Sequence, residues 1–148
     1  MGSIVTERGL HPALAGAVAA TAWALAEPLD RRLFRCHYSD VLLLGKTVTQ
    51  GRLAWPIGLG IHAANGALFG LAFDRTRRRL PIGKEKLALG MALAEHVGLY
   101  PLSYLVDRYH PARGTDGVPP MLTNPRAFAQ ATVRHALFGV LLGRLSRD

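Results

Sequence analysis

Polar and ionisable side chains lie inside three long apolar stretches of this sequence. They are His62, Asn65, Glu95, His96, Arg134 and His135. A charge at the centre of a membrane costs about 2.5–3.5 kcal/mol on insertion scales, so such groups should face inward and pair. Histidine changes charge near neutral pH, which suits proton sensing or transfer. These residue types predict an ion, proton or small-solute site, or polar contacts that hold helices together.

Glu95 and Arg134 are the clearest candidates for an ion pair. Each lies near the middle of its stretch, and the two stretches are neighbours in the chain that should run antiparallel. Both side chains should therefore lie near the same depth, where the guanidinium would keep the carboxylate ionised.

A metal site is the alternative for the three histidines. Zinc or iron would accept His62, His96 and His135 as ligands. However, each lies on a different stretch, no H-E-x-x-H motif is present, and Arg134 would repel a cation. No glycine-rich phosphate loop or nucleophile elbow is present. We expect no cofactor, and a membrane-embedded enzyme or metal protein stays as a second alternative.

Four apolar stretches must position these residues. They cover about 10–27, 53–73, 87–106 and 127–145. A membrane-spanning helix needs about 20 mostly apolar residues, and the second stretch lacks the polar face of a soluble bundle helix. Glu27-Pro28 should end the first stretch. The sequence predicts a single all-α domain, 1–148: an integral membrane bundle of about four transmembrane helices. The connection 27–52 should hold a short helix that lies at the interface or folds back.

The first stretch has a rival interpretation. A charged start, an apolar run and the ALA before Glu27 resemble a secretory signal with its cleavage site. The run is only weakly hydrophobic, which favours a retained helix.

The net charge of +8 and the single cysteine restrict the partners. Basic residues gather where apolar stretches end, and no groove-reading helix or aromatic RNA platform is present, so we expect no nucleic acid. Attraction of the RTRRR run to anionic lipid is simpler. That short connection should face the cytoplasm, which puts both termini inside. One cysteine excludes an intramolecular disulfide.

Small residues recur at helical spacing in all four stretches. The pairs are Gly16 with Ala20, Gly66 with Gly70, Gly90 with Ala94 and Gly98, and Gly139 with Gly143. Small residues let membrane helices approach closely. The pattern predicts a tight bundle in the lipid bilayer, with a homo-oligomer or a membrane-protein partner as further expectations.

Four segments of the chain carry a family resemblance. They are TAWALAEPLDRR, IHAANGALFGLAF, LALGMALAEHVGLYPL and ATVRHALFG. In this order the chain resembles the YagU-like family of small bacterial inner-membrane proteins, from about residue 13 to residue 147. The resemblance implies about four spans and an activity that is not established. It points to Trp23, Glu27, Pro28, His62, His96, Pro101 and His135. Glu95 and Arg134 do not match the family pattern, and the connection between the first two spans is shorter.

Two functions follow as hypotheses. The first is transport of a proton, an ion or a small solute through the polar cluster, with Trp23 and Glu27 near the outer mouth. The second is a structural or accessory membrane scaffold, in which the same cluster fixes helix packing.

Overall fold

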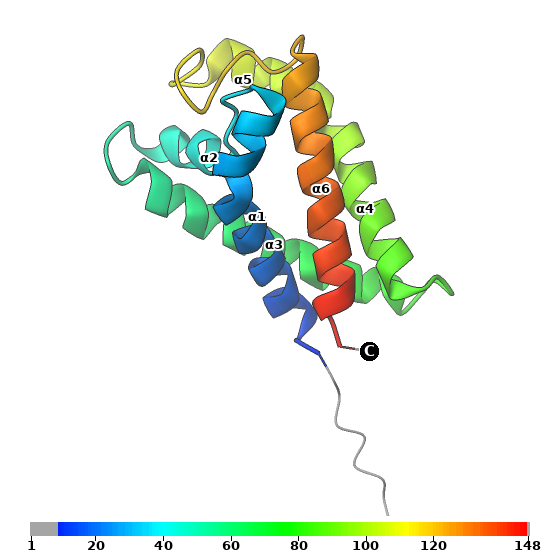
Figure 1. The fold of residues 1–148 in the computed structure, drawn as a ribbon. Coiled ribbons are helices and arrows are strands. Elements are labelled where there is room, and N and C mark those ends of the chain that lie inside the picture. The colour runs from blue at the N-terminus through cyan, green and yellow to red at the C-terminus, as the bar shows by residue number, and fades with distance from the viewer. Residues whose placement is uncertain (1–8, 148) are drawn as a thin grey trace, which may run out of the picture.

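The regular elements in the described part of the chain are all helices, which confirms the all-α class. The computed structural model describes residues 9–147. Its helices are α1 (Pro12–Phe34), α2 (Asp40–Val48), α3 (Ala54–Arg77), α4 (Lys84–Leu99), the short 3-10 helix η1 (Tyr100–Leu102), α5 (Ser103–Tyr109) and α6 (Pro125–Leu145). Helix α1 packs on α3 and α6, α2 packs on α3, and α4 packs on α6 (Figure 1). The charged start that the signal alternative needs lies outside the described residues.

Helix α1 continues past the proline that was expected to end it. Pro28 stands inside α1, which runs on to Phe34 and ends at Arg35 in the left-handed conformation, φ 49°. Proline removes one backbone donor but does not forbid a helix when packing holds the next turn. The predicted end at Glu27-Pro28 was therefore wrong. The added turns carry Asp30, which binds Arg134 of α6.

The third apolar stretch is not one helix. Helix α4 ends at Leu99, the 3-10 turn η1 holds Pro101, and α5 then runs to Tyr109. Pro101 has no backbone N–H with which to continue the α-helical hydrogen bonds, and short 3-10 segments often form such a joint. The prediction of a continuous span over 87–106 was wrong.

The other elements match their predictions closely. Helix α3 begins at Ala54, one residue into the stretch 53–73, and extends to Arg77, and α6 covers 127–145. The connection 27–52 holds α2, a short helix folded back against α3. Ser39 begins α2 as its N-cap, because its hydroxyl accepts the backbone N–H of Leu42 at 3.0 Å.

Glycines set the distances between the packed helices. A Cβ placed on Gly16 of α1 would lie 2.0 Å from the carbonyl oxygen of Gly66 in α3. A Cβ on Gly139 of α6 would lie 2.7 Å from Cα of Leu89 in α4. These backbones approach so closely that no side chain fits between them, as small residues allow in membrane helices. The predicted stripe on α4 differs: a Cβ on Gly90 or Gly98 would meet no atom within 4 Å.

The connections fall at two opposite ends of the molecule. At one end the two terminal segments meet: the backbone N–H of Leu10 donates to Leu145, and Lys84 Nζ donates to the carbonyl of Ser146 at 3.0 Å. At the other end the backbone N–H of Ser39 donates to the carbonyl of Gly117. Figure 1 shows the terminal segments together at the bottom and the loop before α6 at the top. The chain thus passes back and forth between these ends.

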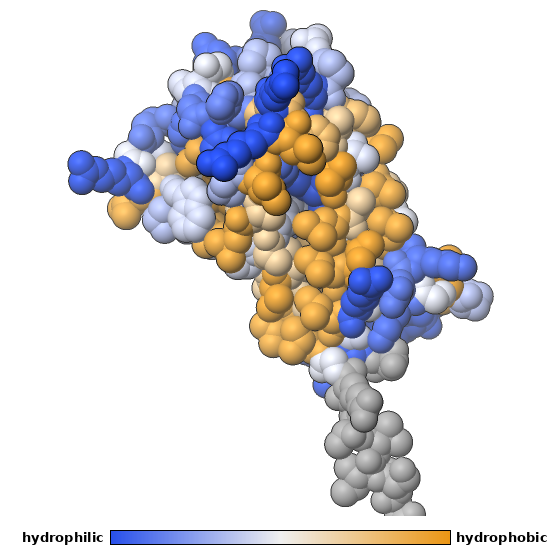
Figure 2. Space-filling model, in the orientation of Figure 1, coloured by the Kyte–Doolittle hydropathy of each residue, from blue (hydrophilic) through white to orange (hydrophobic). Residues whose placement is uncertain are grey.

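An apolar core fills the half of the bundle nearest the termini. It consists of Ala15, Ala19, Ala20, Trp23, Phe73, Leu87, Ala88, Ala92, Phe138 and Leu142. On length and hydropathy, α3 is the one helix in the described part of the chain that could cross a membrane. Figure 2 shows apolar surface along the body of the molecule, between hydrophilic surface at the top and at the lower right.

Candidate functional site

Arg134 lies at the centre of a buried ion-pair network. Its side chain is only 2% exposed. Its Nε and Nη2 donate to the two carboxylate oxygens of Asp30 at 2.5 and 2.6 Å, and its Nη1 donates to Asp40 at 2.6 Å. Nη2 also donates to the carbonyl of Tyr38, whose ring lies under the guanidinium, 5.1 Å from Cζ to the ring centroid. The network joins α1, α2 and α6.

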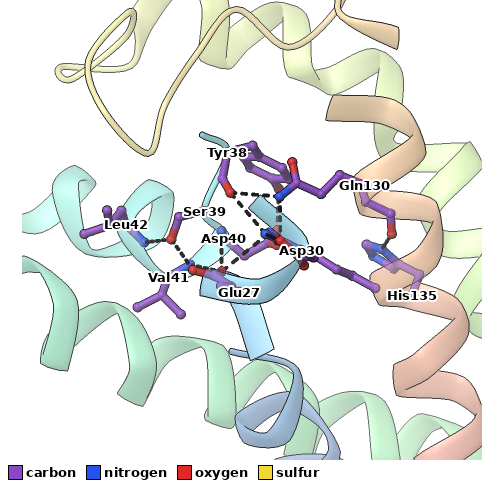
Figure 3. A network of polar contacts seen from close by, with 11 residues as sticks. Glu27, Asp30, Tyr38, Ser39, Asp40, Val41, Leu42, Gln130 and His135 are labelled. Carbon is purple, nitrogen blue, oxygen red and sulfur yellow. Dashed lines mark hydrogen bonds and ion pairs between the residues drawn. The ribbon is translucent and has the colours of Figure 1, made fainter. Parts of the chain in front are cut away.

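Gln130 and Tyr38 complete this network. Gln130, one turn before Arg134 on α6, donates its amide N–H to Asp30 at 2.6 Å, and Tyr38 donates its hydroxyl to Asp40 (Figure 3). Every Arg134 nitrogen has an acidic or carbonyl partner. Such satisfaction is the condition under which a buried ion pair is tolerated.

Glu27 caps α2 from a neighbouring helix. Its Oε1 accepts the backbone N–H groups of Asp40 at 2.9 Å and Val41 at 3.4 Å, and its Oε2 accepts the hydroxyl of Ser39 at 2.5 Å (Figure 3). The first N–H groups of a helix have no partner inside it, and its N-terminus favours negative charge. Glu27 is only 4% exposed. Placing it at an open mouth was wrong.

The predicted pair of Glu95 with Arg134 does not form. Arg134 turns toward α1 and α2, whereas Glu95 Oε2 lies 3.9 Å from Nε2 of His135. Neighbours on a helix point about 100° apart, so Arg134 and His135 face different partners. Equal depth does not determine the direction in which each side chain points. The two acids that it binds, Asp30 and Asp40, lay outside the predicted spans.

The three histidines come together around Trp23. The Trp23 ring lies 4.9 Å from His62 and 5.0 Å from His135, and the His135 ring stacks on His96 at 4.8 Å, centroid to centroid. The rings come from α1, α3, α4 and α6. Sequence had placed them at similar depth, and here they form one continuous group.

Hydrogen bonds fix the protons of two of these rings. His135 Nδ1 lies 2.8 Å from the carbonyl of Ala131, so Nδ1 carries the proton and donates it. His96 Nε2 lies 2.9 Å from the hydroxyl oxygen of Thr132, whose own proton goes to the carbonyl of Phe128. His96 Nε2 is therefore a donor. The free nitrogen of a neutral His135 is Nε2, the atom that faces Glu95.

A cavity of about 190 Å³ opens beside these rings. Its polar lining comes from five helices: Trp23, Asp40, His62, Asn65, Glu95 and His135. Its remaining lining is Ala20, Leu43, Leu44, Gly66, Phe69 and Phe138. Most of the polar residues predicted from sequence thus share one space. Arg134 does not line it.

A second cavity of about 240 Å³ adjoins the first. The two share Leu43, Glu95 and His135 as lining residues. The second is mainly apolar, with Leu99, Leu102, Val106 and Met121 among its walls, and it contains His96. Glu95 and His135 thus stand between a polar and an apolar compartment.

Two buried nitrogens in the first cavity's lining residues have no partner among residues 9–147. They are Trp23 Nε1 and His62 Nε2. Both side chains are more than nine-tenths buried. A buried donor or acceptor without a partner costs about 1–3 kcal/mol, so such atoms commonly meet water or a ligand.

The metal alternative does not fit this arrangement. Within the described part of the chain, no three His, Cys, Asp or Glu side chains are placed to share one metal ion. His62, His96 and His135 lie around Trp23 in a row of ring contacts, with Trp23 between His62 and His135. These ring contacts give no support to a shared metal at His62, His96 and His135.

Electrostatics at the start of α2 favour an ionised Asp40. Burial alone would raise the pKa of its carboxyl group, but Arg134, the nearby His62 and the Tyr38 hydroxyl outweigh burial and lower this pKa below its usual value. Burial raises the pKa of Tyr38, and the adjacent Asp40 raises it further. Tyr38 thus stays a hydrogen-bond donor to Asp40.

Comparison with known proteins adds no assignment. No family model, curated protein or solved structure matches this chain.

Proposed function

We propose that this protein is a small multi-pass membrane protein whose polar cavity takes up a small solute together with proton exchange. The observation that carries the proposal is the convergence of Trp23, Asp40, His62, Asn65, Glu95 and His135 on one cavity. Polar sites inside apolar bundles are costly and mark substrate or proton pathways.

Membrane insertion is supported by the surface and the packing. In this proposal α1, α4 and α6 cross the bilayer packed beside α3, the one described helix that is long and apolar enough to cross by itself, and α2 and the loops lie at its edges. Large apolar side chains are exposed along α1, including Leu14, Leu25, Leu29 and Leu33, and along α3, including Leu68 and Leu71. Glycine contacts replace large interlocking side chains where the helices cross. Both features suit a lipid solvent better than water.

We propose that the membrane is a bacterial inner membrane and that the end of the molecule where Leu10 meets Leu145 faces the cytoplasm. The dense basic run before α4 lies on that side and fits the positive-inside rule. Cysteines introduced for Arg79 and for Thr115, in a Cys36→Ser background, test this. An impermeant thiol reagent applied to intact cells should label the cysteine at 115 only. Extraction of the protein by alkaline carbonate would refute insertion.

Glu95 and His135 form the proposed proton site. His135 donates through Nδ1, so Nε2 and the Glu95 carboxylate are two acceptors that face each other at 3.9 Å. One added proton on either group removes their repulsion. Asp40 and His62 are the other titratable groups that line this cavity. A solute that approaches Glu95 would compete with that proton.

The cavity is closed toward the termini. Phe73, Ala88 and Leu142 belong to the apolar core that fills that half of the bundle. Passage to the cytoplasmic side would therefore need a second conformation, in which the helix ends nearest the termini separate while the Arg134 network still joins α6 to α1. Alternating access of this kind is the usual behaviour of sites near the middle of a membrane.

Proteoliposomes with a trapped pH dye test proton exchange. Under an imposed potential, the wild-type protein should acidify or alkalise the lumen, and Glu95→Gln should slow this movement about tenfold or more. Glu85→Gln is the matched control, since Glu85 is exposed on the same helix and lines neither cavity. Equal rates for the wild type and Glu95→Gln would overturn the proposal.

An accessory scaffold stays as the second candidate. The observation in its favour is the Arg134 network, which is fully paired and acts as a clamp between helices. In this case the protein should co-purify with a membrane partner or as an oligomer in mild detergent. A monomer without partners would exclude it.

A further inference from the structure

The lining of the first cavity contains acidic side chains but no lysine or arginine. The two carboxylates are those of Asp40 and Glu95. Arg134 is bound by Asp30 and Asp40 and has Glu27 at 3.5 Å, so one guanidinium faces three carboxylates. Repulsion of a cation by Arg134, expected from the sequence, is therefore offset by its own partners. The cavity favours a positively charged guest.

Aromatic rings form part of its wall. Trp23, Phe69 and Phe138 all line the cavity, with Phe69 and Phe138 edge to face at 5.2 Å and Trp23 next to Phe138 at 6.4 Å. The faces of such rings attract ammonium groups, and aromatic cages are a common way to hold quaternary ammonium ions. Glu95 supplies the counter-charge. Its side chain is 41% exposed and accepts no hydrogen bond from any of residues 9–147.

The unpaired nitrogens specify a second group on the guest. His62 Nε2 has no partner among the described residues. In the neutral tautomer whose proton is on Nδ1, Nε2 is an acceptor, while Trp23 Nε1–H is always a donor. A hydroxyl group can accept from Trp23 and donate to His62 at once. The ring centroids of Trp23 and His62 are 4.9 Å apart, so Trp23 Nε1 and His62 Nε2 belong to one small region.

We propose that this cavity binds a small organic cation that carries a hydroxyl group, an amino alcohol of the choline type. The ammonium group lies against the aromatic wall near Glu95, and the hydroxyl group lies between Trp23 and His62. This assignment rests on the proposed function of the cavity, whose solute it names, but it concerns binding and not transport.

Four probes separate the features of the guest. Choline carries both charge and hydroxyl, tetramethylammonium lacks the hydroxyl, and 3,3-dimethylbutanol is the uncharged isostere. Phosphocholine is the free form of a zwitterionic lipid headgroup. Titration calorimetry on full-length protein in maltoside detergent, which contains no choline, should rank choline first. The affinity of each other probe should be at least about tenfold lower than that of choline.

Each outcome decides the assignment. Equal binding of dimethylbutanol would remove the role of charge, and equal binding of tetramethylammonium would remove the role of the hydroxyl group. The lining has no basic side chain that could pair with a phosphate, so phosphocholine should bind weakly. Equal binding of phosphocholine would make a lipid headgroup the guest. Any of these results, or no choline binding, overturns the proposal.

Two variants identify the residues. Glu95→Gln should weaken choline binding about tenfold, whereas the exposed Glu85→Gln should bind as the wild type does. Trp23→Phe keeps an aromatic ring but lacks the N–H, so it should bind choline and tetramethylammonium alike. Proton movement in liposomes without choline binding would leave the proposed function standing and remove only the guest. Choline binding without proton movement would support the assigned guest and overturn proton exchange as part of the proposed function.

Discussion

Arg134 and Asp30 form a two-point ion pair between residues 104 positions apart in the chain. Both contacts are 2.5–2.6 Å long and connect the end of α1 to the middle of α6. Asp40 adds a third contact from the first turn of α2. One side chain thereby fixes three helices around the cavity.

Removing the guanidinium should therefore be severe. Arg134→Met leaves the carboxylates of Asp30 and Asp40 without a counter-charge, with only Gln130 and Tyr38 as side-chain donors, and breaking a buried pair in this way costs about 3–5 kcal/mol. Arg134→Lys keeps the charge but loses the planar two-point contact, so its loss should be intermediate. Thermal unfolding in detergent gives the order. Arg126→Met, on the exposed first turn of α6, should stay near the wild-type midpoint, and an Arg134→Met midpoint just as high would contradict the clamp.

The cap of α2 gives a local prediction. Ser39→Ala removes the hydroxyl that bonds both Leu42 N–H and Glu27, which should cost about 1 kcal/mol. Hydrogen exchange of the first α2 amides should become about fivefold faster, while α3 exchanges as before. Thr76→Ala is the control, because it also removes a helix hydroxyl but caps nothing. Unchanged exchange in α2 would show that Ser39 is not its cap.

Asp40 makes stability depend on pH. Its pKa is lower in the folded protein than in the unfolded chain, so ionised Asp40 stabilises the fold at any pH above the unfolded value of about 4. That contribution is lost as the pH falls below about 4 toward the folded pKa. The stability difference between wild type and Asp40→Asn should shrink as the pH falls below about 4. A difference that grows in acid would reverse the sign and refute this account.

The sequence could predict the height of side chains but not their direction. Helices α3 and α6 follow the long apolar stretches, and His62, His96 and His135 do meet, as their depth suggested. The Glu95–Arg134 pair failed because neighbouring positions on a helix point to different faces, which a depth argument ignores.

Asp30 and Asp40 were missed for another reason. Pro28 indicated a helix end, so the following residues were assigned to a connection, although α1 continues through them. Tertiary contacts decided this case: the extra turn is held by the Asp30–Arg134 pair, and α2 by Glu27. The available signal was that a buried arginine can bind more than one acid, and two acids, Asp30 and Asp40, lay in the connection after the first span.

Close helix contact at Gly66 gives the sharpest test of packing. A Cβ at this position would lie 2.5 Å from the carbonyl oxygen of Gly16 and 2.6 Å from the Ala20 side chain. Because backbone atoms cannot move aside cheaply, Gly66→Ala should force α1 and α3 apart and cost about 1–3 kcal/mol or more. Gly60→Ala is the matched control on the same helix, since its Cβ would meet no atom within 4 Å. There the better helix propensity of alanine should raise stability slightly, by about 0.5–1 kcal/mol. Thermal unfolding of the two variants should therefore move in opposite directions, and a stable Gly66→Ala protein would mean that α1 and α3 do not cross at this contact.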